Sequence, residues 1–472
     1  MQCLFFMEGK RYSRQAGQLK TGVADDIIYK IQSSSVQAQY TRARSLFIVN
    51  ESDLSHGSHI FRKEVRRRME SCYELSTNTY LCYLEQELSS WIMGRVAFDS
   101  PVNGPALQKA ADDMLRFMPF LSARKAAAPE GDRYVLIPCE DPLRVRNRSR
   151  EAAPDDGEHG GSMIDISYEG STLFLNISHA LTDGCGYVAV MRYLAARYLS
   201  YERDEQPEPA EAFNRAFPYD YADPLSAVAA TGKRFEFNYP RTEYFKEEEL
   251  DPDRVRFFSL DCNERRITEL ARDAEGSFSG VLAGALGSAL TDCKPNAGTV
   301  VITCPMNMRG ALGCTQTLQN CTQSMRYVFP PAIRKYPFQQ KLSLLKGQLY
   351  IQKSEEYCLP RFAEWRGQLQ ALRSIPSIAG KAEALRASMR ISPYPVMSDL
   401  GAVDFGKDNS HIMDLWICAP VVGIAGILVL AHRFGGRCRL DISSTVRSGL
   451  WLEHFRRTLS EAGIDNELIR HS

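Results

Sequence analysis

The stretch NISHALTDGCGYVAV, from Asn176 to Val190, ends an apolar segment on a histidine, an aspartate and a glycine. The segment MIDISYEGSTLFLNISH (Met163–His179) predicts two strands around a Glu-Gly turn. The following GYVAVMRYLAARYL (Gly186–Leu199) has helical spacing. We therefore expect His179 at the end of a buried strand, just before a turn and a helix, where a packed sheet can hold a side chain rigidly for chemistry.

A histidine in this place is a candidate general base. Imidazole has an unperturbed pKa of about 6.5, so a neutral ring can take a proton near physiological pH. Asp183 is the second catalytic candidate: it can orient the imidazole, or it can face inward and pair with a cation, because a buried unpaired carboxylate is costly. Arg309, at the end of the predicted strand GTVVITCPMNMRG, is the partner we expect. Gly184 is expected to let the backbone turn tightly where the helix begins.

The composition is that of a globular protein without net charge. The chain has 472 residues, 44% hydrophobic and 24% charged, which suits two domains of roughly 200 residues each. Its 57 basic residues balance its 57 acidic ones, so charge offers no case for a nucleic-acid partner. The 13 cysteines are scattered without C-x-x-C spacing, which indicates reduced thiols. The most apolar run, APVVGIAGILVLA, is too short to span a bilayer, and we expect a cytoplasmic protein with no integral membrane segment.

Changes in composition along the chain predict its organisation. Residues 1–68 are polar and end in the basic run RKEVRRR, whereas the stretch ERDEQPEPAEAFNRAFPYD is rich in charge and proline, as linkers are. Near the end, GILVLAHRFGGRCRLDISST predicts a hairpin turning on Gly435 and Gly436. We expect four segments: a polar, disordered N-terminal extension (1–68), a first α/β half carrying the histidine (69–200), a linker or crossover (201–250) and a second α/β half (251–472).

The segment His179-Ala-Leu-Thr-Asp183-Gly184 resembles the H-x-x-x-D-G motif of the CoA-dependent acyltransferase superfamily. That superfamily includes chloramphenicol acetyltransferase, plant BAHD acyltransferases, alcohol acetyltransferases and the condensation domains of nonribosomal peptide synthetases. Other stretches follow in the family's order and resemble its first helix, the helix pair that opens its second half, its P-x-N-x-R segment and its S-N-L-G strand. They are DSPVNGPALQKAADDMLRFMPFLSAR, ITELARDAEGSFSGVLAGAL, CPMNMRG followed by Asn320, and VMSDLGAVDF.

The resemblance implies an α/β (α+β) fold of two chloramphenicol-acetyltransferase-like domains that form a pseudo-dimer with an interdomain tunnel. His179 would be the general base, and no acyl-enzyme would form. Acyl-CoA would be the donor, as a co-substrate and not a bound cofactor, and a small-molecule alcohol or amine the acceptor. Asp183 would be structural and paired with Arg309, while Ser178 and Asn320 would line the tunnel.

Two positions depart from the family pattern. Ser178 stands where two-histidine members have their first histidine, and Asp399 replaces the asparagine of S-N-L-G. One alternative is therefore a catalytically silent relative that binds a ligand or partner between the halves. Another keeps the chemistry but takes the donor from a carrier protein, as condensation-type enzymes do.

Two further hypotheses concern the motif itself. Cys185 adjoins it and could act as a nucleophile that carries the acyl group, although a buried thiol is the simpler interpretation. A metal site would need more ligands than the motif supplies, and His411, His432 and His454 are isolated, without ligand spacing. We expect no metal.

Overall fold

The structure is a computed structural model that describes residues 79–84, 91–139, 143–147, 162–208, 223–225, 228, 244–294, 296, 298–389, 394–421 and 425–470. The predicted extension (1–68) lies outside these residues, as do residues 209–222 and 229–243 of the predicted linker (201–250). In the part of the chain that is described, no helix combines the length and apolar character needed to cross a membrane.

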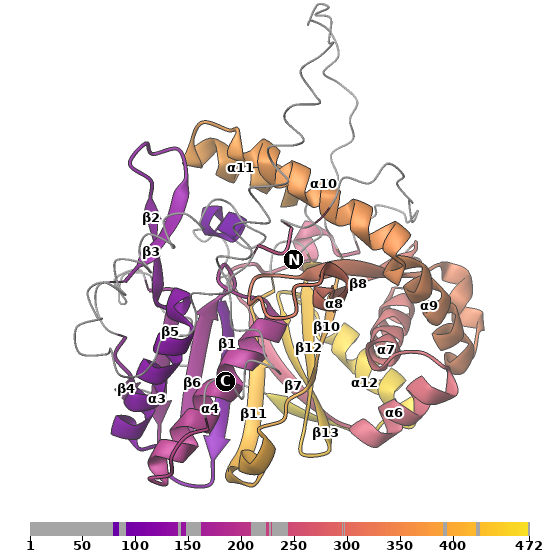
Figure 1. Cartoon of the computed structure of the whole chain (residues 1–472). Helices are drawn as coiled ribbons and strands as arrows, with labels where there is room; N and C mark the ends of the chain where they lie inside the picture. The colour runs from indigo at the N-terminus through magenta and orange to yellow at the C-terminus, as the bar shows by residue number, and fades with distance from the viewer. Residues whose placement is uncertain are drawn as a thin grey trace, which may run out of the picture. The chain divides into compact units, whose positions relative to one another are not determined.

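A five-stranded sheet forms the core of the first half, in the order β11-β1-β6-β5-β4 (Figure 1). β6 pairs antiparallel with β1 on one side and with β5 on the other. The turn between β5 and β6 contains Gly170 at a φ of +54°, a conformation that favours glycine. The two strands predicted around the Glu-Gly turn are confirmed. The strands are β1 (Trp91–Phe98), β4 (Arg146–Asn147), β5 (Ile164–Glu169), β6 (Thr172–Ser178) and β11 (Ile412–Cys418).

Two helices, α3 (Gly104–Phe117) and α4 (Gly184–Glu202), pack against each other beside this sheet (Figure 1). α3 begins at Asn103, whose side chain accepts a hydrogen bond from the backbone of Ala106 (3.2 Å), and it ends before Pro119 because proline cannot continue a helix. Its buried residues recur at helical spacing, as its sequence predicted: Ala106, Leu107, Ala110, Ala111 and Met114. A separate pair of strands, β2 (Ala123–Ala127) and β3 (Tyr134–Pro138), follows it.

A seven-stranded sheet forms the second half, in the order β14-β7-β13-β12-β10-β8-β9. The hairpin predicted on Gly435 and Gly436 is confirmed: β12 and β13 pair antiparallel, and both glycines have positive φ, of +58° and +76°. The strands are β7 (Arg256–Asn263), β8 (Val300–Asn307), β9 (Thr322–Phe329), β10 (Val396–Ala402), β12 (Ile427–Phe434), β13 (Arg437–Ser444) and β14 (Asn466–Arg470).

Helices cover one face of the second sheet. α7 packs on β8, β9 and β10, and α6, α9 and α12 pack against α7 (Figure 1). Nearly every residue of α7 is buried, because sheet and helices enclose it. The helices of this half are α6 (Glu264–Asp273), α7 (Phe278–Cys293), the short α8 (Arg309–Leu312), α9 (Phe338–Lys353), α10 (Glu355–Arg373), α11 (Ile378–Met389) and α12 (Leu450–Glu461).

One strand crosses between the halves. β11 follows β10 in the chain but pairs antiparallel with β1, so a strand from the segment 251–472 completes the first sheet. The buried carboxylate of Asp441 on β13 ties this strand to the second sheet, since it accepts hydrogen bonds from the Ile417 backbone N–H (2.8 Å) and the Ser259 hydroxyl (2.5 Å) and contacts His432 Nε2 (2.9 Å). The boundary expected at residue 250 assigns β11 to the second half, whereas β11 pairs with a strand of the first sheet.

Candidate active site

The motif begins where β6 ends. The Ser178 backbone N–H donates to the Met163 carbonyl (2.8 Å), and the Leu181 N–H donates to the Ser178 carbonyl (2.9 Å), which closes a turn directly after the strand. The Ser178 hydroxyl is buried and accepts a hydrogen bond from the Ala180 N–H (3.3 Å). Ser178 therefore helps to form the turn that presents His179.

His179 is held in an environment that favours its neutral form. The residue is partly buried and its Nδ1 atom is fully buried. Burial lowers the pKa of the imidazole from its ordinary value, and the nearby Asp183 carboxylate offsets this only in part. The lowered pKa favours the uncharged ring, which is the form able to accept a proton.

Asp183 stands at the N-terminus of α4, where its carboxylate collects three donors. One oxygen accepts hydrogen bonds from the Gly186 N–H (2.9 Å) and from Arg309 Nη2 (2.8 Å). The other accepts a hydrogen bond from the Cys321 N–H (3.1 Å). Asp183 is 2% exposed and Arg309 is 3% exposed. Both oxygens are therefore engaged away from the imidazole, which supports the structural role for Asp183 over the orienting one.

Arg309 is enclosed by a cradle of oxygen acceptors. Its Nε donates to the Thr317 carbonyl (2.9 Å), Nη2 to the Gln319 carbonyl (2.9 Å), and Nη1 to the Asn307 side chain (3.2 Å). Burial alone would lower the pKa of Arg309, but Asp183 more than offsets it and the pKa rises above its usual range. The partner expected from the sequence is in place, and every nitrogen of its guanidinium donates at least one hydrogen bond.

The start of α4 packs closely against the second half. A Cβ added at Gly184 would lie 2.5 Å from Cδ2 of Leu400 on β10, and the Thr182 hydroxyl donates to the Leu318 carbonyl (2.9 Å). Gly184 does not have a positive φ, so a left-handed backbone conformation is not what calls for glycine at this position. A glycine fits here because the second half approaches the helix so closely.

The remaining candidates lie near the pair and take part in local turns. The Asn320 side chain is buried, and its oxygen accepts hydrogen bonds from the backbone and hydroxyl of Thr322 (2.9 and 2.6 Å). Asp399 accepts a hydrogen bond from the Gly401 N–H (2.9 Å), where φ is +83°. An asparagine oxygen could accept the same bond, so this departure from the family pattern leaves the turn intact.

Sequence analysis missed part of the cradle. Asn307 accepts hydrogen bonds from the backbone N–H and Nη1 of Arg309, and its amide nitrogen donates to Cys185 Sγ (3.4 Å). Its place two residues before Arg309 in CPMNMRG could have indicated this contact. The Thr317 and Gln319 carbonyls belong to the backbone, so no residue type reveals them.

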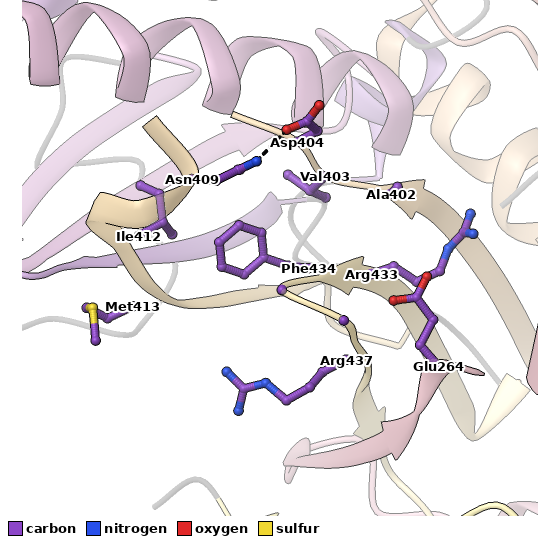
Figure 2. A pocket seen from close by; sticks show the side chains of 12 residues that line it. Glu264, Ala402, Val403, Asp404, Asn409, Ile412, Met413, Arg433, Phe434 and Arg437 are labelled. Carbon is purple, nitrogen blue, oxygen red and sulfur yellow. Dashed lines mark hydrogen bonds between the residues drawn. The ribbon is translucent and has the colours of Figure 1, made fainter. Parts of the chain in front are cut away.

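A separate pocket lies at the turn between β12 and β13. It has a volume of about 380 Å³ and is lined by residues of β10, β11, the hairpin turn and the start of α6, among them Glu264, Arg433 and Phe434 (Figure 2). Asn409 in the short helix η6 (Gly406–His411) donates to Asp404 on its rim (2.6 Å). The residues expected from the motif do not line this pocket.

Comparisons with known proteins identify the fold. No family model matches the sequence, and no curated protein matches it. The crystal structure of F. sporotrichioides TRI101 complexed with coenzyme A and T-2 has a TM-score of 0.56 and 13% identity, covering 80% of this chain and 96% of that one. The epimerization domain from the third module of tyrocidine synthetase B gives 0.54 and 11%, covering 83% and 96%. The first condensation domain of the calcium-dependent antibiotic synthetase, with a substrate analogue, gives 0.52 and 14%, covering 83% and 96%.

The chain has the fold of these three structures, which are TRI101, an epimerization domain and a condensation domain. The mixed α/β class and the resemblance predicted from the sequence are confirmed. In this fold, the motif that follows β6 contacts the second half through Leu400, Leu318 and Arg309.

Removal of the Asp183 charge should destabilise the protein. Asp183→Asn leaves the Arg309 guanidinium buried without its counter-charge, so we expect the free energy of unfolding, measured by urea denaturation, to fall by about 3–5 kcal/mol. The matched control, Asp251→Asn, breaks the more exposed pair with Arg447 (3.4 Å) and should cost no more than about 1 kcal/mol. Equal losses in the two variants would contradict a structural role for the Asp183–Arg309 pair.

Proposed function

We propose that the protein is an acyltransferase that moves an acyl group from a CoA thioester to a hydroxyl or amine. The observation that supports this most is the position of His179 directly after β6, near the buried Asp183–Arg309 pair, where burial lowers the pKa of its imidazole. The comparison with TRI101, crystallised with coenzyme A, supports the choice of donor. Acyl-CoA is a co-substrate here, and no bound cofactor is needed.

In the proposed reaction His179 takes the proton of the acceptor through Nε2, since Nδ1 is buried. The acceptor oxygen or nitrogen forms a bond to the thioester carbonyl carbon, and the carbon–sulfur bond then breaks. The proton passes from the imidazole to the leaving thiolate, which departs as free CoA. A base positioned in this way contributes typically about 10²–10⁴-fold to the rate.

The same proposal assigns the organisation of the chain. Residues 69–200 would form the first acyltransferase-like domain and residues 251–472 the second, with 201–250 as the connection and an interdomain tunnel that admits donor and acceptor from opposite sides. Asp183 and Arg309 would hold the two domains in the spacing that this tunnel needs. Ser178 and Asn320 would lie beside it and shape its wall through the turns that they form.

A second candidate function keeps the chemistry and changes the donor. The comparisons include a condensation domain, and this favours a donor tethered to a carrier protein as the alternative. His179 would serve the same role, so the two candidates differ only in what carries the acyl thioester.

Transfer activity and its dependence on His179 test the proposal. Purified protein incubated with acyl-CoA donors and a panel of alcohols and amines should release free CoA thiol, followed with a thiol reagent. His179→Ala should reduce the rate by about 10²-fold or more while circular dichroism and melting stay unchanged. Activity with a carrier-bound thioester but not with acyl-CoA would favour the second candidate. Full activity in the variant would overturn the assignment of the base.

The pH dependence follows from the state of the imidazole. Transfer needs neutral His179, and burial lowers its pKa, so the active form persists to a pH below the ordinary value of about 6.5. We expect kcat/KM to be level above about pH 7 and to fall as the pH drops through the lowered pKa. If kcat/KM instead rises with pH through a midpoint above about pH 7, a different group must act as the base.

Direct transfer should leave the protein itself unmodified. Burial raises the pKa of the Cys185 thiol, so it is a poor nucleophile at neutral pH. We expect intersecting double-reciprocal lines when donor and acceptor are varied, and no added acyl mass after incubation with donor alone. Parallel lines, with an acyl-enzyme that is lost in Cys185→Ser, would replace direct transfer with covalent catalysis.

A further inference from the structure

Two cysteine thiols lie side by side close to Arg309. Cys314 and Cys321 belong to the loop between α8 and β9, and their Sγ atoms are 3.5 Å apart. Cys314 is partly exposed, next to the exposed Thr315 and Gln316, whereas Cys321 is fully buried. Of the two thiols, that of Cys314 is therefore the one nearer to solvent.

The same loop supplies much of the cradle around Arg309. The Cys314 N–H donates to the Arg309 carbonyl (3.1 Å), and the Cys321 N–H donates to the Asp183 carboxylate (3.1 Å). Between the two cysteines stand Thr317 and Gln319, whose carbonyls accept from the guanidinium. One end of the loop is thus hydrogen-bonded to the Arg309 backbone and the other to the Asp183 carboxylate, so a change in the distance between the thiols alters the surroundings of the ion pair.

We propose that Cys314 and Cys321 form a redox-sensitive dithiol that a low-molecular-weight disulfide converts to an intramolecular disulfide, which displaces the Arg309 cradle. The effect on acyl transfer rests on the function proposed above; the modification itself does not. The reagent class is a small disulfide of the glutathione type.

The exchange is a balanced two-electron reaction. The Cys314 thiolate attacks one sulfur of the small disulfide and displaces one small thiol, which leaves a mixed disulfide on Cys314. The Cys321 sulfur then attacks the Cys314 sulfur and displaces the second small thiol. The two protons of the protein thiols leave with the two small thiols, and the small disulfide is the species that is reduced.

The surroundings of the two thiols set the order of attack. The hydrogen bond with Cys314, followed by burial, raises the pKa of the Cys321 thiol. Cys321 therefore keeps its proton, and the more exposed Cys314 is the thiol that reacts first. The Arg309 guanidinium acts in the opposite sense on Cys321 and assists its deprotonation in the second step.

Closing the disulfide moves the loop. The sulfur atoms must approach from 3.5 Å to about 2.0 Å. Cys321 is enclosed by the core, so the exposed side of the loop takes up the movement. Displacement of the carbonyls of Thr317 and Gln319 then removes acceptors from a buried guanidinium, which is unfavourable, and loosens the pair that positions the start of α4.

Peptide mapping of the whole protein measures the modification independently of activity. The protein is treated with glutathione disulfide, blocked with N-ethylmaleimide and digested with trypsin, which places both cysteines in one peptide, Gly310–Arg326. We expect this peptide to lose two hydrogens and to take up no maleimide, and to recover two maleimide-reactive thiols after reduction. Cys262 and Cys438 lie opposite each other on β7 and β13 and are buried, so they serve as an internal control that should stay reduced.

Two further measurements test the coupling to the ion pair. Hydrogen exchange in Gly310–Arg326 should become faster after oxidation, because the exposed side of the loop moves and loses the bond from the Cys314 N–H to the Arg309 carbonyl. Transfer activity should fall by about tenfold or more, because small displacements of groups near a catalytic site lower the reaction rate. Reduction with dithiothreitol should restore the activity. For each of the variants Cys314→Ser and Cys321→Ser, transfer activity should be the same with and without glutathione disulfide. Cys293→Ser, which removes a partly buried thiol elsewhere, should respond like the parent.

The outcomes separate this proposal from the proposed function. If Gly310–Arg326 still carries two free thiols after treatment, there is no redox-sensitive dithiol. If the disulfide forms while hydrogen exchange stays unchanged, the coupling to Arg309 is wrong. A protein without transferase activity that still forms the disulfide and gains faster exchange would overturn the proposed function and leave the dithiol standing.

Discussion

The buried ion pair between Asp183 and Arg309 is the interaction on which the arrangement of the motif depends. A buried pair is tolerable only when its remaining donors and acceptors are satisfied, and here three donors surround the carboxylate while carbonyls and an amide surround the guanidinium. These groups come from the start of α4, the end of β8 and the loop before β9. The pair can therefore form completely only when the two halves have folded against each other, which couples the geometry around His179 to the whole fold.

A second buried carboxylate joins the halves at another place. Asp441 lies in the second sheet. Its carboxylate accepts a hydrogen bond from the backbone of β11, which is a strand of the first sheet, and contacts a histidine of the second sheet. Both contacts use a charged group in the interior. Loss of one partner there is strongly destabilising, so the hydrogen-bonding geometry must be maintained. Apolar packing alone would allow the sheets to slide, whereas two hydrogen-bonded carboxylates define their spacing.

The sequence predicted those features that depend on neighbouring residues and on the type of side chain. The strands around Gly170, the helix from Gly104 and the hairpin at Gly435 follow from periodicity and turn chemistry, and the order of motifs led to the correct fold. The exchange of β11 could not be predicted in this way, because its alternation fits either sheet and only the distant partner β1 decides between them. The carbonyls around Arg309 were missed because backbone acceptors carry no signal of residue type. The contact of Gly184 with Leu400 was missed because the two residues are far apart in the sequence.

The arrangement also explains why the aspartate nearest to the histidine is not its partner. An unpaired carboxylate beside His179 would favour the imidazolium, which cannot accept a proton. Arg309 neutralises Asp183 and draws its oxygens toward the second half, so burial dominates and the pKa of His179 falls. The charges of the motif thus stabilise the contact between the halves, while burial favours the neutral form of the imidazole, which the proposed general base requires.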